Sequence, residues 1–244
     1  MSKAITGPRF PQFLPASTKA KRLKVLIWGP SGSGKTTLAL QAPRPAVIDL
    51  EGGSELYGDS FPFDVSQLTT ADEVMDAVNG LMTTNHDYQT VVIDPITVYW
   101  EALQRKWSEI FLQRNRTSKG FRHEYYDFQP KDWMTIKDEL RLLMAKLVRL
   151  DMHVIAIARQ KPLYADGGFM RVVGDTFDCE KSIPYVFDTV IQTYCDEKGK
   201  FMAKCHKDRT HKLPTEPFEI SYDILARHFG PEILGTAPDT KDDA

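Results

Sequence analysis

The sequence predicts an α/β fold in which helices flank a mostly parallel sheet. Apolar strand-like runs alternate along the chain with segments whose apolar residues recur at helical spacing. A glycine-rich loop joins the first run to the first helical segment. The last two runs are separated only by residues 196–199, which have the composition of a hairpin turn. We therefore expect a C-terminal antiparallel hairpin extension after the parallel core.

The expected elements follow one another in a regular order. The strand-like runs are residues 24–28, 46–50, 90–94, 153–158, 186–194 and 200–206. Between the second and third runs, Thr70 and Glu73 have the spacing of a capping box, which predicts the start of a helix. Two longer helices carry apolar stripes, formed by Trp100, Leu103, Trp107, Ile110 and Phe111 and by Trp133, Ile136, Leu140, Leu143, Met144 and Leu147.

Length and composition limit the class of protein. A chain of 244 residues fits one enlarged α/β domain that needs no disulfide to stabilise its core. The net charge of −2 excludes a polycation that coats nucleic acid, so any such contact requires a local patch. Its three cysteines have no C-x-x-C spacing, which is typical of reduced thiols in a cytoplasmic protein. No apolar run has membrane-spanning length, and we expect no membrane partner.

The chain divides into a core and two short flanking segments. Residues 1–20 hold three prolines and two phenylalanines among polar residues, and we expect a flexible arm there. Residues 21–234 form the expected core. Residues 235–244 are rich in aspartate, and we expect a disordered acidic tail.

A phosphate-binding loop is the most specific motif in the sequence. Residues 29–36 match G-x-x-x-x-G-K-[ST] between a strand-like and a helix-like run. In such loops, backbone N–H groups and a helix N-terminus surround phosphate oxygens. Lys35 is expected to reach the β- and γ-phosphates of ATP, and the Thr36 hydroxyl to bind Mg²⁺. The candidate nucleotide-binding residues are Gly29, Pro30, Ser31, Gly32, Ser33, Gly34, Lys35, Thr36 and Thr37.

A second metal ligand is expected at the end of the third strand-like run. Residues 90–94 are an apolar run that ends in Asp94, the arrangement of a Walker B strand, and the alternative is a solvated strand end. The next residue is Pro95 and not glutamate, which argues against the AAA+ type, where the catalytic glutamate stands at that position. Another carboxylate is then needed to polarise water, and Glu51 follows the second run.

Together these motifs resemble the RecA-type recombinase ATPases. The resemblance lies in GPSGSGKTTL at residues 29–38 and VIDLEG at residues 47–52. It implies a RecA-like P-loop fold and assigns Glu51 the role of general base. A solvated acid at a strand end is the alternative for Glu51.

Two further segments match the same family. Residues 153–160, HVIAIARQ, resemble the strand whose terminal glutamine senses the γ-phosphate, and Gln160 matches it. Arg159 stands where the family has asparagine. Residues 203–209, AKCHKDR, resemble the K-x-R element of the RecA/DnaB/KaiC group, which implies that Lys207 and Arg209 reach the ATP site of a neighbouring subunit. A charged turn is the alternative.

The resemblance also indicates where single-stranded DNA would bind. The segment after the Walker B helix interleaves cations with aromatic rings, a pattern that suits phosphates and stacked bases. Its candidate contacts are Arg114, Arg116, Lys119, Phe121 and Arg122. A solvated helix end is the alternative. Residues 161–180, expected to form a second loop, hold more acids than bases, which does not favour phosphate.

The resemblance implies a function as well as a fold. A RecA core without accessory domains looks like the phage-encoded RecA-like ATPases of single-strand annealing and recombination. We therefore expect a DNA-stimulated ATPase in the cytoplasm of a phage-infected or prophage-bearing host. It would assemble into a filament or ring on single-stranded DNA, alongside a single-strand-binding protein. Residues 13–16, FLPA, resemble the F-x-x-A plug between recombinase protomers. The alternatives are a motor or loader ATPase of phage replication or packaging, and a P-loop small-molecule kinase.

Overall fold

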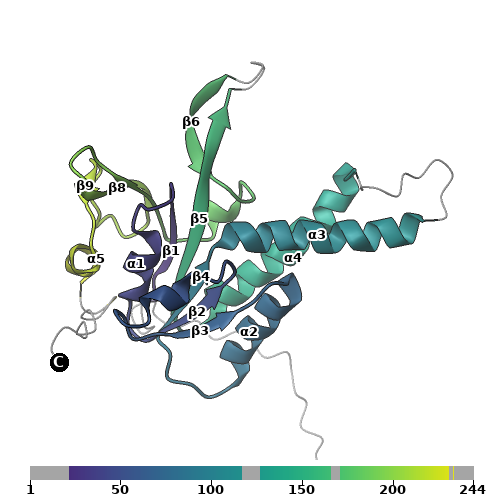
Figure 1. Ribbon diagram of the computed structural model, residues 1–244, viewed down its shortest axis with the longest axis horizontal. Coiled ribbons are helices and arrows are strands. Elements are labelled where there is room, and N and C mark those ends of the chain that lie inside the picture. The colour runs from purple at the N-terminus through teal and green to yellow at the C-terminus, as the bar shows by residue number, and fades with distance from the viewer. Residues whose placement is uncertain (1–21, 117–126, 166–170, 231–232, 234–244) are drawn as a thin grey trace, which may run out of the picture.

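A single sheet with helices on both faces forms the body of the molecule (Figure 1). The computed structural model describes residues 22–116, 127–165, 171–230 and 233. The strands are β1 (Lys24–Gly29), β2 (Pro45–Asp49), β3 (Asp64–Gln67), β4 (Thr90–Asp94), β5 (His153–Tyr164), β6 (Val172–Phe177), β7 (Thr189–Cys195), β8 (Phe201–Asp208) and β9 (Phe218–Glu219). Among the described residues they lie in the order β3-β2-β4-β5-β1-β7-β8-β9, and β6 pairs with β5 outside this row.

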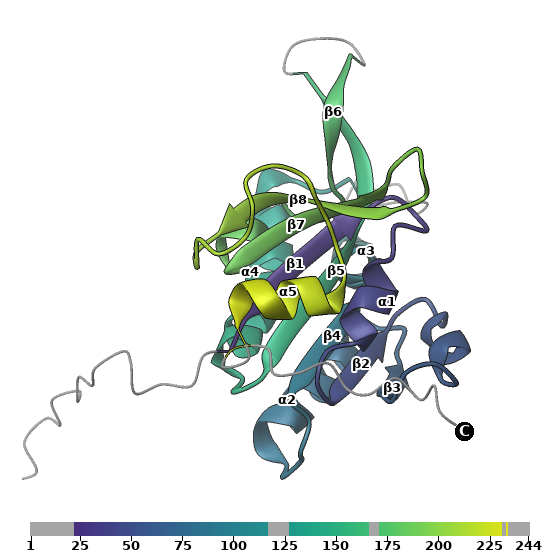
Figure 2. The ribbon, with the colours of Figure 1, turned by 90° about the vertical axis from the view of Figure 1, so that its left-hand side faces the viewer.

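The helices divide between the two faces of the sheet. They are α1 (Lys35–Leu40), α2 (Ala71–Thr83), α3 (Ile96–Asn115), α4 (Pro130–Arg149) and α5 (Tyr222–Phe229), with the short 3-10 helices η2 (Ser54–Tyr57) and η3 (Ile183–Tyr185). On one face, α2, α3 and α4 bury residues such as Tyr99 and Leu143 against the sheet. On the other face, α1 and α5 bury Leu40 and Phe229 (Figure 2). The predicted fold class is confirmed.

Six strands of the row, β3, β2, β4, β5, β1 and β7, are parallel, and this brings their carboxyl ends to one edge. β1 lies between β5 and β7, and Gly29 is opposite Arg159 on β5. β4 lies between β2 and β5, and Asp94 is opposite Asp49. β8 and β9 then extend the sheet in antiparallel fashion, as the hairpin turn predicted. In an open parallel sheet, ligands bind at the edge where the strands end.

The segment after residue 160 differs from the expected loop. β5 continues to Tyr164 and pairs antiparallel with β6, so a hairpin stands away from the body of the molecule (Figure 1). The outer part of β5 and most of β6 are exposed, in contrast to the buried part that begins at His153. A strand exposed on both faces has no alternation of apolar and polar residues, so the pattern that reveals half-buried strands is missing here.

Two other strands and one α-helix were not predicted, and each is short. All four residues of β3 are exposed, and β9 has only two residues. α5 starts at Ser221, whose hydroxyl accepts a hydrogen bond from the N–H group of Ile224. By contrast, the capping box of α2 is confirmed, because Thr70 and Glu73 exchange hydrogen bonds. The capping box was therefore read correctly, whereas the exposed β3 and the two-residue β9 gave no signal. In α5, the Ser221 cap and the buried Leu225 and Phe229 were signals that sequence reasoning missed.

The flanking segments lie beyond what the structure describes. The predicted arm at residues 1–20 and its FLPA motif fall outside the described residues, as does the tail at residues 235–244. The division into arm, core and tail therefore stays a prediction. Within the described part of the chain, no helix combines the length and the apolar character needed to cross a membrane.

We expect Gly29→Ala to lower the free energy of unfolding by about 1–3 kcal/mol, because β1 and β7 approach closely there. A Cβ atom at Gly29 would lie 2.2 Å from the Thr193 carbonyl oxygen and 2.9 Å from the Ser33 hydroxyl. Gly53→Ala is the matched control, since Gly53 has φ −102° and no atom within 4 Å of such a Cβ. Urea unfolding measures both variants, and equal losses would contradict the prediction.

Candidate active site

A cleft of about 660 Å³ opens at the edge where β1, β2, β4 and β5 end. Residues from five separate segments of the chain line it. They are the loop and first helical residues Gly29, Pro30, Ser31, Gly32, Ser33, Gly34, Lys35, Thr36 and Thr37, with Glu51, Tyr57, Asp94, Pro95, Ile157, Arg159, Gln160 and Phe201. The predicted nucleotide-binding residues, both predicted metal ligands, Glu51 and Gln160 therefore meet in one cleft.

The loop between β1 and α1 has the geometry of an anion cradle. Gly32 and Gly34 have φ values of 73° and 78°, which glycine adopts without steric cost. No atom lies within 4 Å of a Cβ built on Gly32. The Ser33 hydroxyl bonds to the Pro30 carbonyl at 2.9 Å and to the Thr193 hydroxyl at 2.8 Å, which fixes the loop to β7. This conformation fits a phosphate group, because backbone N–H groups at a helix start bind anions.

Lys35 lies within this cradle. Its Nζ donates a hydrogen bond to the Pro30 carbonyl at 2.6 Å. Burial lowers the pKa of Lys35 below its ordinary value, and the nearby Asp94 and Glu51 carboxylates oppose that shift. The ammonium group thus rests against a neutral carbonyl of its own loop, a partner that a phosphate oxygen can replace with a stronger, charge-assisted bond.

Thr36 and Asp94 fit the requirements of a magnesium ion. The Thr36 hydroxyl donates a hydrogen bond to Asp94 Oδ2 at 2.6 Å. A hydroxyl and a carboxylate are the oxygen ligands that Mg²⁺ prefers, and Thr36 and Asp94 would hold the ion. Burial raises the pKa of Asp94 to about 6. A buried carboxylate with one hydrogen-bond donor gains stability from a nearby cation.

Asp49 holds the turn that carries Glu51 to the cleft. The buried carboxylate accepts hydrogen bonds from the N–H groups of Glu51, Gly52 and Ser54 and from the Ser54 hydroxyl, at 2.5–2.9 Å. Burial alone would raise the pKa of Asp49, but these bonds hold it below its ordinary value. Sequence reasoning missed this role, although an aspartate before a Glu-Gly-Gly-Ser turn is a recognisable signal.

Glu51 is paired with Arg159 across the mouth of the cleft. Both Nε and Nη2 of Arg159 donate to Glu51 Oε1, the Nε bond at 2.8 Å. Nη1 of Arg159 lies 3.4 Å from Glu101 Oε1. Sequence reasoning had singled out Arg159 only as a departure from the asparagine of the resembled family. The ion pair places a cation beside the predicted base, and both residues line the cleft.

Gln160 is the first of a series of polar side chains that runs from the cleft through β7 to β8. Gln192 on β7 approaches Gln160 Oε1 with its side-chain nitrogen at 3.4 Å. Gln192 Oε1 in turn lies 3.2 Å from His206 Nε2, and the His206 ring packs on Trp28 with centroids 5.3 Å apart. Polar side chains therefore connect the floor of the cleft to β8 across β7.

Comparisons with known proteins agree with this geometry. A family described as an AAA domain matches residues 21–215. The chain belongs to this family, although Pro95 stands where AAA+ ATPases have their catalytic glutamate. The crystal structure of the RadB recombinase is similar to it, with a TM-score of 0.50 and 18% identity over 83% of this chain and 89% of that chain. This likeness shows that the AAA domain has the RecA-like P-loop fold. No curated protein sequence matches the chain.

The predicted trans-acting cations of the AAA domain lie away from its own cleft. β8 runs antiparallel to β7, so Lys207 and Arg209 lie at the edge opposite the phosphate loop. Lys207 Nζ donates to the carbonyls of Pro184 and Phe187 at 2.7 and 2.5 Å. Arg209 pairs with Asp188 at 3.1 Å and bonds to the Tyr185 carbonyl. Neither cation reaches the cleft of its own chain, and their role toward a neighbour stays a prediction.

Two of the predicted DNA contacts fall within the described residues. Arg114 and Arg116 are exposed at the C-terminal end of α3. α3 begins directly after Asp94 and Pro95, and its helical rise carries Arg114 about 27 Å from its first residue. Lys119, Phe121 and Arg122 lie outside the described residues. Their part in nucleic-acid binding stays a prediction.

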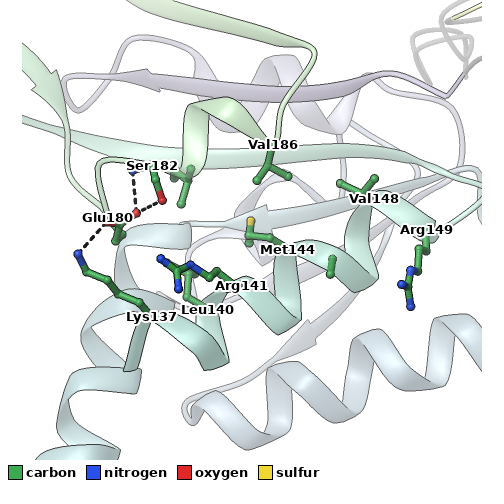
Figure 3. Close-up of a pocket in the computed structure, with 11 residues that line it drawn as sticks. Lys137, Leu140, Arg141, Met144, Val148, Arg149, Glu180, Ser182 and Val186 are labelled. Atoms are coloured by element: carbon green, nitrogen blue, oxygen red, sulfur yellow. Dashed lines mark hydrogen bonds and ion pairs between the residues drawn. The ribbon is translucent and has the colours of Figure 1, made fainter. Parts of the chain in front are cut away.

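A second pocket of the AAA domain has a different chemistry. This groove of about 420 Å³ runs between α4 and η3 (Figure 3). Apolar side chains such as Leu140, Met144 and Val148 line it, and a pair of Lys137 and Glu180 at 3.1 Å closes one end. It has no glycine loop, so the phosphate-binding chemistry of the AAA domain lies in the other cleft.

We expect Asp94→Asn to raise the free energy of unfolding of the AAA domain, measured in EDTA, by about 2–3 kcal/mol near pH 7.5. The Asp94 carboxyl has a pKa of about 6 in the folded chain against 3.8 as its ordinary value. The folded state therefore holds this proton more tightly, and wild-type stability falls as the pH rises from about 4 to about 6.

Asparagine removes the buried charge and keeps an oxygen that accepts from Thr36. Urea unfolding at pH 4 and pH 7.5 should show the variant gaining stability only at the higher pH. A difference that does not change with pH would contradict the explanation from burial of charge.

Proposed function

We propose that this chain is an ATPase of DNA recombination or annealing, which hydrolyses Mg-ATP in the cleft while it binds single-stranded DNA. One observation carries the proposal: Lys35, the Thr36–Asp94 pair and the Glu51 carboxylate converge on a single glycine cradle. Cation, metal ligands and base are the parts that phosphoryl transfer to water requires. The RecA-like fold supports the same choice.

Each residue has a distinct task in this proposal. When bound, Mg-ATP supplies the phosphoanhydride that is cleaved and a metal ion that draws charge from the phosphate oxygens. The loop from Gly29 to Thr36 holds the phosphates, Lys35 neutralises developing charge, and Asp94 with Thr36 holds the metal. Glu51 takes the proton of the attacking water through its carboxylate. Gln160 contacts the terminal phosphate from the end of the core part of β5.

The DNA part of the proposal rests on where the exposed elements start. The β5–β6 hairpin begins at Gln160, so a shift of that residue on nucleotide binding is passed directly into the hairpin. Arg114 and Arg116 add cations at the far end of the helix that follows Asp94. The similar RadB protein is a recombinase by its title, which supports single-stranded DNA as the partner. We also propose that the protein is encoded by a phage and that it acts together with a single-strand-binding protein.

Assembly with further copies completes the proposed site. Lys207 and Arg209 lie at the edge of the sheet opposite their own cleft, a position from which they can serve only another copy. A heterologous contact of this kind builds a ring or a filament. Cations supplied by a neighbour stabilise the charge on the transferred phosphoryl group.

We expect single-stranded DNA to raise the ATPase rate of the wild-type chain. The reason is that both proposed DNA-binding elements, the β5–β6 hairpin and α3, begin at strand ends that line the nucleotide cleft. Lys35→Ala should abolish turnover, and Glu51→Gln should lower kcat by about 10²–10⁴-fold with ATP affinity retained, because only the base is lost. Phosphate release with and without DNA measures these rates. A rate raised by nucleosides and not by DNA would favour the small-molecule kinase instead.

The salt dependence of DNA binding provides the control for that experiment. Replacing both Arg114 and Arg116 by alanine should reduce the slope of log affinity against log salt by about 1–1.5, since each phosphate contact contributes about 0.7 on single strands. Arg227→Ala, an exposed change on α5 across the sheet, should leave the slope unchanged. An equal slope in all three proteins would remove the end of α3 from the DNA surface.

We expect Arg209→Ala to lower turnover at least tenfold at near-normal ATP affinity, because Arg209 acts on the cleft of another copy. Mixing this variant with Lys35→Ala in equal amounts before assembly should restore activity to roughly a quarter of wild type. At random, about half of the clefts have Lys35, and about half of these face a neighbour that has Arg209. Activity of 1:1 mixtures measures this. A mixture no more active than its components would contradict the borrowed cation.

A further inference from the structure

Arg159 occupies a position in the cleft that the proposed mechanism leaves without a task. It is the first exposed residue after the buried part of β5, and its side chain is 47% exposed. Its backbone N–H bonds to the Thr97 hydroxyl at 3.0 Å, and its carbonyl accepts from the N–H of Asp178 at 2.7 Å. The backbone is thus fixed by other residues, and the guanidinium group alone is free to change partners.

The guanidinium group is shared between two carboxylates. Two of its nitrogens donate to the same oxygen of Glu51, and a third lies 3.4 Å from Glu101. The side chains of Glu51 and Glu101 are 45% and 42% exposed, so these pairs lie at the surface of the cleft. Exposed ion pairs are weak, because water screens the attraction and ordering two long side chains opposes it. Exchange of one carboxylate for another anion therefore changes the free energy little.

A terminal phosphate is a better partner for Arg159 than either carboxylate. The guanidinium fork matches phosphate oxygens in a bidentate way, and a phosphate carries more charge than one carboxylate. Among the described residues that line the cleft, Lys35 and Arg159 are the only lysine or arginine side chains. Lys35 bonds to the Pro30 carbonyl within the glycine loop, whereas Arg159 pairs with Glu51 on the turn after β2.

We propose that Arg159 is a further γ-phosphate-binding residue of its own chain, beside Lys35 and Gln160, and that it releases Glu51 when it changes partner. Before nucleotide binds, Arg159 neutralises Glu51 and so weakens it as a base. With ATP bound, the guanidinium group binds the terminal phosphate and leaves the Glu51 carboxylate unpaired and able to take the proton of water. ADP has no third phosphate, so Glu51 stays paired. This inference rests on the proposed function, because it assumes that a triphosphate lies in this cleft.

The proposal makes Arg159 responsible for preference between ATP and ADP. The test uses the Glu51→Gln/Glu101→Gln protein, in which neither acid partner carries charge, so that loss of screening cannot imitate loss of a phosphate contact. Adding Arg159→Ala to this background should weaken ATP binding by at least tenfold and ADP binding by less than threefold. Titration calorimetry with Mg-ATP and Mg-ADP measures both affinities without any need for turnover.

Lys161→Ala in the same background is the matched control. Lys161 is a cation two residues further along β5, paired with Asp178 at 2.8 Å, and its loss should leave both affinities within about twofold. Arg159→Lys is a second variant that keeps the charge but not the fork, and it should weaken ATP binding by at least threefold with ADP unchanged. A merely structural role would change both nucleotides by the same factor, and that result would overturn the proposal.

Failure of this inference is distinguishable from failure of the proposed function. Equal loss of ATP and ADP affinity on removing Arg159, in a protein whose ATP binding depends on Lys35, overturns only the role of Arg159. ATP binding that does not depend on Lys35 overturns the proposed site, and the role of Arg159 with it. Residual turnover in Glu51→Gln alone bears on the base and leaves the measured ratio of affinities as the deciding result.

Discussion

The nucleotide cleft depends on the parallel register of four strands. Asp94 stands opposite Asp49 and Gly29 opposite Arg159, so the phosphate loop, the predicted metal ligand Asp94 and the turn of Glu51 reach one edge together. A slip of one residue would turn each side chain to the other face of the sheet. The inner half of β5 prevents this, because it is buried from His153 to Ala158 with helices packed on both sides. The arrangement of the site at the carboxyl ends of the strands thus depends on packing in the middle of the sheet.

Two neighbouring aspartates at this edge illustrate how environment separates structural from chemical tasks. Asp49 accepts four hydrogen bonds within its own turn, and these hold its pKa below the ordinary value despite burial. Asp94 has one hydrogen bond from Thr36, and burial raises its pKa to about 6. The first carboxylate is satisfied by the protein and shapes the loop. The second is left under-satisfied, and such a group is suited to receive a cation.

The sequence predicted those parts of the molecule that depend on local spacing. The phosphate loop, the capping box at Thr70 and the strand that ends at Asp94 are readable because each is a contiguous pattern with its own physical cause. The pair of Arg159 and Glu51 joins residues 108 positions apart, and no local pattern indicates it. The β5–β6 hairpin was missed for another reason: its strands are exposed, so burial leaves no alternating pattern in the sequence.

The distribution of cations suggests how such a site responds to assembly. In the single chain, Arg159 is bound to acids and Arg209 is bound to Asp188 and the Tyr185 carbonyl, so neither is idle. To bind a phosphate, each arginine must exchange its present partner for the phosphate, and exchange between exposed partners changes the free energy little. Small differences in partner affinity then decide which state is populated. In the proposed mechanism, a nucleotide offers Arg159 a stronger anion and a neighbouring copy offers Arg209 a new surface, and neither change requires the fold to be rebuilt.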